Sequence, residues 1–263
     1  MEQRERPPEI EHGTHYDPAL ENTAIIPIGK IEDDFYDWWA RHHAVLKLRH
    51  EVNSDVVLIG DSITHLWGGV PETPGEPARG AAAFTRTFAG MRVLNLGFGY
   101  DRTQNVLWRL DHGEFSDLRP KFVVLNIGTN NLVATPRARA NTPVETAAGV
   151  REILARIRAG SPDSRIILMG VFPRRESPSD PLRAKIAELN TLLSALSDPP
   201  HLSFIDLKTQ FLSPDGTISR EIMNDFIHPT ELGYRIWGEA LTAAFKAIPS
   251  PSPKNNLLEN NLR

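Results

Sequence analysis

Short apolar runs alternate with stretches of helical periodicity through most of this chain. The apolar runs occupy residues 56–60, 93–97, 122–128, 165–171 and 202–207. Stretches with the apolar spacing of amphipathic helices lie at 103–112, 143–159, 181–196 and 229–247. Such alternation is typical of βαβ units, in which helices cover both faces of a parallel sheet. The sequence therefore predicts an α/β fold, a three-layer α/β/α sandwich around a five-stranded parallel sheet.

The length of the chain favours a single large domain. With 263 residues, 40% of them hydrophobic, it can bury a sizeable core. We expect an N-terminal extension over residues 1–30, one domain over 31–248 and a disordered tail over 249–263, where "PSPSPKNNLLENNLR" offers little to bury. A proline- and glycine-rich insertion occupies residues 71–84.

One further helix is predicted within residues 32–52, ahead of the first apolar run. Its apolar side chains suit one helix face and include Phe35, Trp38, Trp39, Val45, Leu46 and Val52. Packing against the core is the common use of such a face, and a homodimer contact is the alternative.

Composition excludes several classes of function. The formal net charge is −4, so no strong basic field points to nucleic acid or to an anionic membrane surface. The absence of cysteine excludes disulfides, thiolate metal sites and a cysteine nucleophile. No apolar run reaches the roughly 20 residues that span a bilayer. The expected partner is a small molecule, and the compartment stays open between the cytoplasm and secretion with the signal peptide absent from this chain.

The ends of the predicted strands carry a set of polar side chains. Ligands of open parallel sheets bind at the carboxyl ends of the strands. The first run, "VVLIG", is followed there by Asp61 and Ser62. Other loops of interest are "GFGYDRTQ" at 97–104, "GTNN" at 128–131 and "NDFIHP" at 224–229. Ser62 alone would suit a helix N-cap, and Asp225 and His228 alone would suit a surface turn, but together they predict a catalytic site.

Each residue type has a role in acyl transfer. A serine hydroxyl such as that of Ser62 needs a base to accept its proton, and His228 can be that base. Asp225 can orient the imidazole and stabilise its charged form. The side-chain amide of Asn130, with backbone N–H groups at Ser62 and at Gly99 or Tyr100, can hold the developing oxyanion.

These four blocks resemble the signature blocks of the SGNH, or GDSL, hydrolases over roughly residues 52–247. The segment "GYDRTQNVLWRL" at 99–110 further resembles the branch that includes the platelet-activating-factor acetylhydrolase catalytic subunits and their bacterial relatives. The resemblance implies a flavodoxin-like sheet, ester hydrolysis through an acyl-serine, and neither metal nor organic cofactor. It makes Ser62 the nucleophile and an oxyanion donor, Asn130 the side-chain donor, and Asp225 with His228 the rest of the triad. Tyr100 departs from the pattern, because the family places glycine directly before the acidic residue.

Residues beside these blocks are candidates for supporting or shaping the site. Asp61, Asp101, Arg102 and Gln104 are candidates for hydrogen-bonding support of the site. We expect Asn131 to be structural, His65 to be exposed to solvent, and Arg174, Arg175 and Glu176 to be solvated on the rim of the site. The histidine pairs at 12 and 15 and at 42 and 43 lack further ligands, so no metal site is predicted.

The sequence thus predicts a serine esterase for short acyl esters. The acyl group favoured is acetyl, carried by a carbohydrate, a small alcohol or a lipid-like molecule. The alternative is a protein that binds an acylated glycan in the same cleft without cleaving it. Fold and triad alone do not choose the substrate, since variable loops build the alcohol side.

Overall fold

The computed structural model describes residues 21–247, and their core is a five-stranded parallel sheet. Its strands are β1 (Val56–Gly60), β2 (Val93–Gly97), β3 (Phe122–Asn126), β4 (Arg165–Met169) and β5 (Leu202–Ile205). They lie in the order β2-β1-β3-β4-β5, which is the flavodoxin-like order. The predicted α/β fold and its five strands are confirmed, with the third, fourth and fifth strands each ending two residues earlier than expected.

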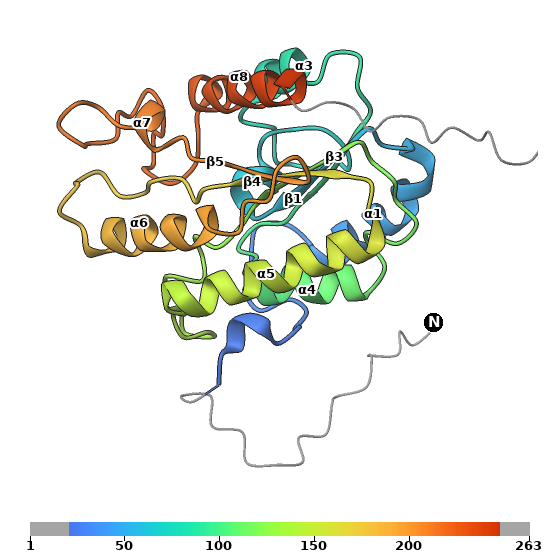
Figure 1. The fold of residues 1–263 in the computed structure, drawn as a ribbon, viewed down its shortest axis with the longest axis horizontal. Coiled ribbons are helices and arrows are strands. Elements are labelled where there is room, and N and C mark those ends of the chain that lie inside the picture. Colours follow the sequence, from blue (N-terminus) through green and yellow to red (C-terminus); the bar gives the residue numbers. More distant parts are fainter. Residues whose placement is uncertain (1–20, 248–263) are drawn as a thin grey trace, which may run out of the picture.

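Helices cover both faces of this sheet (Figure 1). One face carries α4 (Thr103–Asp111), α5 (Pro143–Gly160) and α6 (Pro181–Ser194), and the opposite face carries α3 (Ala81–Thr87) and α8 (Glu231–Ala247). Strand side chains alternate between two cores: Val57 and Ile59 pack with the first helix set, whereas Val56 and Leu58 pack with the second. All five residues of β1 are buried, as expected for a central strand covered on both sides.

The predicted helix at 32–52 is shorter than expected. Helix α1 spans Trp38–Val52, and the Asp37 side chain accepts a hydrogen bond from the amide of Ala40 at its N-terminus. Phe35 precedes this cap and is 61% exposed, so its assignment to the helix face was wrong. Trp38 and Val45 are buried in the same core as α4 and α5.

Two predicted segments lie partly outside the described residues. Of the extension at 1–30, residues 21–30 are described; they include η1 (Thr23–Ile25), and the amide of Ile28 donates to the carbonyl of Gln104 on α4. The tail at 249–263 and residues 1–20 are outside the description, so the domain boundaries stay predictions. The insertion at 71–84 runs into a helix, since α3 begins at Ala81.

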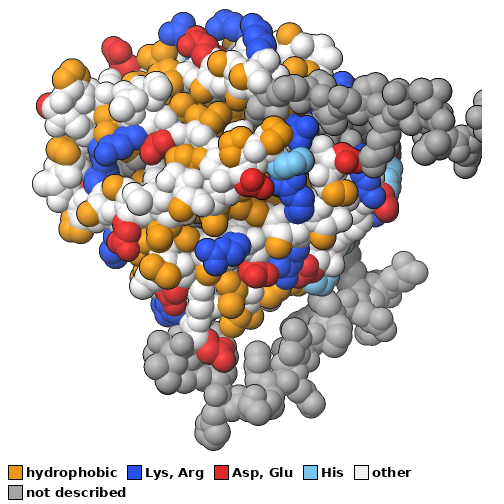
Figure 2. All heavy atoms as spheres, viewed as in Figure 1, with side chains coloured by type: hydrophobic (Ala, Val, Ile, Leu, Met, Phe, Trp, Pro, Cys, Tyr) orange, Lys and Arg blue, Asp and Glu red, His pale blue; other side chains and the backbone are white. Residues whose placement is uncertain are grey.

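On the face drawn in Figure 2, basic and acidic side chains are interspersed rather than gathered by sign. Within residues 21–247, no helix is both long and apolar enough to cross a membrane.

Two glycines allow the short helix α2 (Ser62–His65) to lie directly on the strand ends. Gly60 and Gly97 are paired in register at the carboxyl ends of β1 and β2. A Cβ on Gly60 would overlap the Thr64 side chain, and a Cβ on Gly97 would overlap the backbone of His65. This close approach places Ser62, the first residue of α2, at the carboxyl edge of the sheet.

Replacing Gly97 with alanine should therefore destabilise the fold. The added methyl group meets backbone atoms of α2, which cannot rotate away, so we expect a loss of about 1–3 kcal/mol or more. Urea unfolding of Gly97→Ala would show a lower midpoint with an unchanged slope. A midpoint equal to that of the parent protein would contradict the close packing.

Candidate active site

Three predicted residues form one chain of hydrogen bonds. Ser62 Oγ lies 2.9 Å from Nε2 of His228. Nδ1 of the same ring lies 2.9 Å from Oδ2 of Asp225. Ser62 comes from the turn after β1, and the other two come from the loop before α8, 166 residues away along the chain from Ser62 to His228. The fold thus brings a hydroxyl, an imidazole and a carboxylate together in the order that acyl transfer requires.

A tight turn fixes the carboxylate relative to the imidazole. Asp225 Oδ1 accepts hydrogen bonds from the amides of Ile227 (3.0 Å) and His228 (2.8 Å). Phe226, which lies between Asp225 and Ile227, has the left-handed φ of 60°. Burial opposes ionisation of Asp225, but the hydrogen bonds from the amide and ring of His228 outweigh it and hold the pKa of Asp225 well below its usual range.

The environment of His228 favours its neutral form. Burial lowers the pKa of the imidazole below its ordinary value of 6.5, and the positive charges of Arg79 and Arg174 act in the same direction. Asp225 opposes them by stabilising the imidazolium. At neutral pH the ring is consequently able to accept a proton.

Several N–H donors of the predicted oxyanion site have no acceptor among the described residues. The backbone amides of Ser62, Gly99 and Tyr100 donate to no described residue. Asn130 uses one side-chain N–H to bind the carbonyl of Asp101 at 3.0 Å, which leaves the second N–H free. Tyr100 adopts the left-handed φ of 60° that normally favours glycine.

A buried ionic network lies beneath the loop that carries these donors. Oδ1 of Asp101 accepts from the indole of Trp38, and its Oδ2 accepts from Nε of Arg109, each at 2.8 Å. Arg109 also binds Glu114 at 2.6 Å, and Glu114 in turn lies 2.7 Å from His42 Nδ1. The sequence prediction included Asp101 but missed Arg109 and Glu114. The available sequence signal was Arg109 itself, a charged residue on the apolar face of the predicted helix at 103–112.

The remaining predicted support residues hold neighbouring loops. Arg102 donates to the carbonyls of Val133 (2.8 Å) and Arg139 (3.1 Å). Gln104 Oε1 accepts from the side-chain amide of Asn131 at 3.0 Å, and Asn131 is fully buried. No described contact joins Arg102 or Gln104 to the triad, so their hydrogen bonds shape the segment after β3.

Comparisons with known proteins decide the family. The family model described as GDSL-like lipase/acylhydrolase matches residues 58–236. The chain belongs to this family. Platelet-activating factor acetylhydrolase IB subunit alpha1 from Homo sapiens is 33% identical over 209 residues, which cover 79% of this chain and 82% of that protein.

Solved structures share the fold of this GDSL-like acylhydrolase. A GDSL-like lipase from Bacteroides thetaiotaomicron superposes with a TM-score of 0.60 at 20% identity, over 78% of this chain and 99% of the other. An acetylxylan esterase from Geobacillus stearothermophilus gives a TM-score of 0.56 at 20% identity, over 73% and 93%. Family and relatives support a carboxylic-ester hydrolase and do not favour a non-catalytic glycan-binding protein.

Two expectations about side chains of this acylhydrolase were wrong. His65 is buried rather than exposed, because α2 lies against the end of β2; its Nε2 is 2.6 Å from Thr73 Oγ1. Arg174 is also buried and donates to Thr129 Oγ1 at 3.3 Å, whereas Arg175 and Glu176 are exposed as expected.

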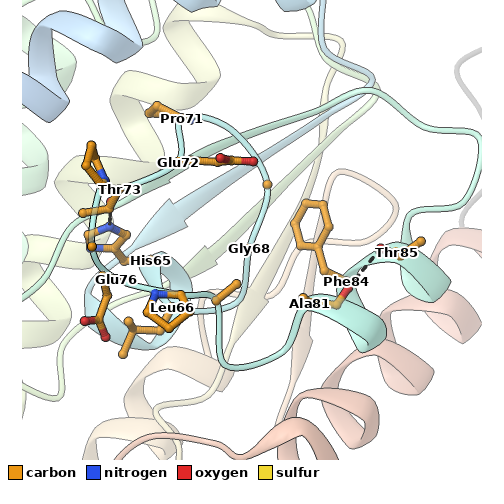
Figure 3. Close-up of a pocket in the computed structure, with 15 residues that line it drawn as sticks. His65, Leu66, Gly68, Pro71, Glu72, Thr73, Glu76, Ala81, Phe84 and Thr85 are labelled. Carbon is orange, nitrogen blue, oxygen red and sulfur yellow. Dashed lines mark hydrogen bonds between the residues drawn. The ribbon is translucent and has the colours of Figure 1, made fainter.

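A cavity of the acylhydrolase is formed by α2, α3 and the segment between them. It has a volume of about 690 Å³ and is lined by residues between 65 and 85, among them Glu72, Glu76 and Phe84 (Figure 3). The triad residues are not among those that line it. Within residues 21–247, no group of three or more histidine or acidic side chains could hold a metal. The histidine pair at 12 and 15, for which no metal was predicted, lies outside the described residues.

Asp61, the residue before the hydroxyl, is a fully buried carboxylate. Its Oδ1 accepts from the amide of Ile63 at 3.0 Å and so caps α2, while Oδ2 has no described partner. Burial raises the pKa of Asp61 to about 7. When the pKa of a carboxyl is higher in the folded than in the unfolded chain, the free energy of unfolding falls as the pH rises from the unfolded pKa to the folded pKa.

Replacing Asp61 with asparagine should therefore stabilise the protein more at about pH 8 than at about pH 5, because the amide caps α2 without the cost of a buried charge. Urea unfolding of Asp61→Asn and the parent at both pH values measures this difference. A smaller gain at the higher pH would contradict it, and would show that a favourable interaction, such as that with Arg174, stabilises the ionised carboxylate.

Proposed function

We propose that this chain hydrolyses short-chain acyl esters, with acetyl as the favoured acyl group, through an acyl-enzyme on Ser62. The observation that carries the proposal is the continuous hydrogen-bond chain from Ser62 Oγ through His228 to Asp225, with both links at 2.9 Å. A serine without such a base is a weak nucleophile at neutral pH.

In the first half of the reaction, Ser62 Oγ attacks the ester carbonyl as its proton passes to His228 Nε2. Asp225 holds Nδ1 of the ring and stabilises the imidazolium that forms. His228 then gives the proton to the departing alcohol, so the C–O bond breaks and the acyl group stays on Ser62. In the second half, His228 accepts a proton from water as the water oxygen attacks the acyl carbon. The bond between this carbon and Ser62 Oγ then breaks, His228 returns the proton to Oγ, and the carboxylic acid is released.

The oxyanion of each tetrahedral intermediate needs fixed donors. The free side-chain N–H of Asn130 and the free amides of Ser62 and of Gly99 or Tyr100 are suited to this task. Removing one such donor typically lowers kcat by about 100- to 1000-fold. Asp101 supports Asn130 through its backbone carbonyl, and the ionic network fixes Asp101 in turn.

The preference for acetyl rests on the relatives. The Homo sapiens relative is named a platelet-activating factor acetylhydrolase, and one structural neighbour is an acetylxylan esterase. The alcohol part is proposed more broadly as a carbohydrate, a small alcohol or a lipid-like molecule, since these two relatives are named for different alcohols.

Replacing Ser62 with alanine should abolish hydrolysis of p-nitrophenyl acetate while leaving the fold intact. The expected loss of kcat is on the order of 10⁶-fold, the scale of a nucleophile acting with its base as one unit. Ser194→Ala, which changes an exposed serine on α6, is the matched control and should keep full activity. Full hydrolysis by folded Ser62→Ala would disprove the proposed mechanism.

The acyl preference is tested with p-nitrophenyl acetate, butyrate and octanoate. We expect kcat/KM to fall from the shortest to the longest chain, and an octanoate ester hydrolysed as fast as acetate would contradict the short-chain proposal. Release of acetate from acetylated xylooligosaccharide and from an acetylated ether phospholipid then distinguishes the carbohydrate from the lipid alternative.

A further inference from the structure

An arginine from the segment between α2 and α3 contacts the carboxylate of the candidate triad. Nη1 of Arg79 donates to Oδ2 of Asp225 at 3.1 Å. The same oxygen accepts from the ring of His228. Asp225 is 39% exposed and Arg79 is 35% exposed, so the guanidinium occupies a side of the carboxylate that water would otherwise solvate.

The backbone around Arg79 is held in place from two sides. Its amide donates to the carbonyl of Leu66, at the end of α2, at 2.7 Å. The next residue, Gly80, lies so close to the ring of Tyr234 that a Cβ would overlap it. Tyr234 belongs to α8 and donates its hydroxyl proton to the carbonyl of Ile63 in α2 at 2.7 Å. The position of the arginine is therefore tied to the helix that carries Ser62.

With Arg79 in place, both oxygens of Asp225 have two donors each. Oδ1 accepts from the amides of Ile227 and His228, and Oδ2 accepts from the His228 ring and the guanidinium. We propose that Arg79 is a positioning residue of the triad, which orients Asp225 Oδ2 toward the imidazole and keeps His228 available as a proton acceptor. This inference rests on the proposed function of the site.

Four charged groups act on His228 from the surrounding elements. Asp225 is in contact with it, Arg79 and Arg174 lower its pKa, and Asp34, from the segment before α1, interacts with it electrostatically. Loss of Arg79 removes one opposing positive charge and leaves Asp225 uncompensated, and both changes raise the pKa of His228. The ring must be neutral to accept the serine proton, so activity falls at low pH as His228 becomes protonated. A higher pKa of His228 would move this acid limb of the pH–activity profile to higher pH.

The test compares Arg79→Met with Arg86→Met, which removes an exposed arginine of α3 whose side chain makes no hydrogen bond or ion pair with a described residue. We measure kcat and kcat/KM for p-nitrophenyl acetate over about pH 5 to 9. For a half-exposed pair the expected loss of kcat in Arg79→Met is about two- to fivefold, with KM unchanged and the acid limb shifted to higher pH. Arg79→Lys, which keeps the charge, should return the limb toward that of the parent.

The inference is overturned if Arg79→Met matches Arg86→Met in kcat and in its acid limb. It is also overturned if kcat falls while the limb stays in place and Arg79→Lys behaves like Arg79→Met, since that pattern means only a disturbed loop. Should Arg79→Met fail to fold, Arg79→Gln is measured with the same expectations. Activity in folded Ser62→Ala would contradict the proposed function itself, whereas an inactive Ser62→Ala with an unaffected Arg79→Met contradicts only this inference.

Discussion

The close approach of α2 to the ends of β1 and β2 is the constraint on which the candidate site depends. Gly97 leaves room for the backbone of α2 and Gly60 leaves room for the Thr64 side chain, so a Cβ at either position would overlap the helix. This contact aims Ser62 outward at the carboxyl edge of the sheet, where the loop before α8 meets it. The hydroxyl of Tyr234 ties α2 to α8, so the two halves of the triad are held by one packing arrangement.

The donors for the oxyanion depend on a different interaction, the buried network centred on Arg109. Its guanidinium lies between the carboxylates of Asp101 and Glu114 and 4.0 Å from the ring centroid of Phe98. Burying three charges costs desolvation free energy, which offsets much of the attraction between them. We therefore assign the network a role in fixing the conformation of the loop rather than in raising the net stability of the fold. Here the arrangement fixes the backbone of the loop after β2, from which the carbonyl of Asp101 holds the Asn130 side chain.

Much of this organisation was predictable from local sequence patterns. Strands and helices follow the apolar periodicity, and Ser62, Asn130, Asp225 and His228 fall at strand ends or in the loop before the last helix, so the topology brings them to one edge. What the sequence did not predict depends on contacts between distant segments. The burial of His65 and the pairing of Arg79 with Asp225 arise only when separate elements pack together, and no short-range pattern encodes them. The ion pairs of Arg109 are more local, since Asp101 and Glu114 lie eight and five residues from it, and its charge on the apolar helix face was their signal. The helix predicted within residues 32–52 begins only at Trp38, because the Asp37 side chain caps its N-terminus there, whereas the apolar spacing had extended it back to Phe35.

The most direct test of the account is whether Ser62 is the residue that becomes covalently modified. A fluorophosphonate, which reacts with a serine activated by a neighbouring base, is added in limited amounts, and the labelled peptide is identified by mass spectrometry while hydrolysis of p-nitrophenyl acetate is followed. The account predicts a single adduct on Ser62 and a loss of activity in proportion to labelling. Continued hydrolysis by fully labelled protein, or inactivation with the adduct on another residue, would contradict it.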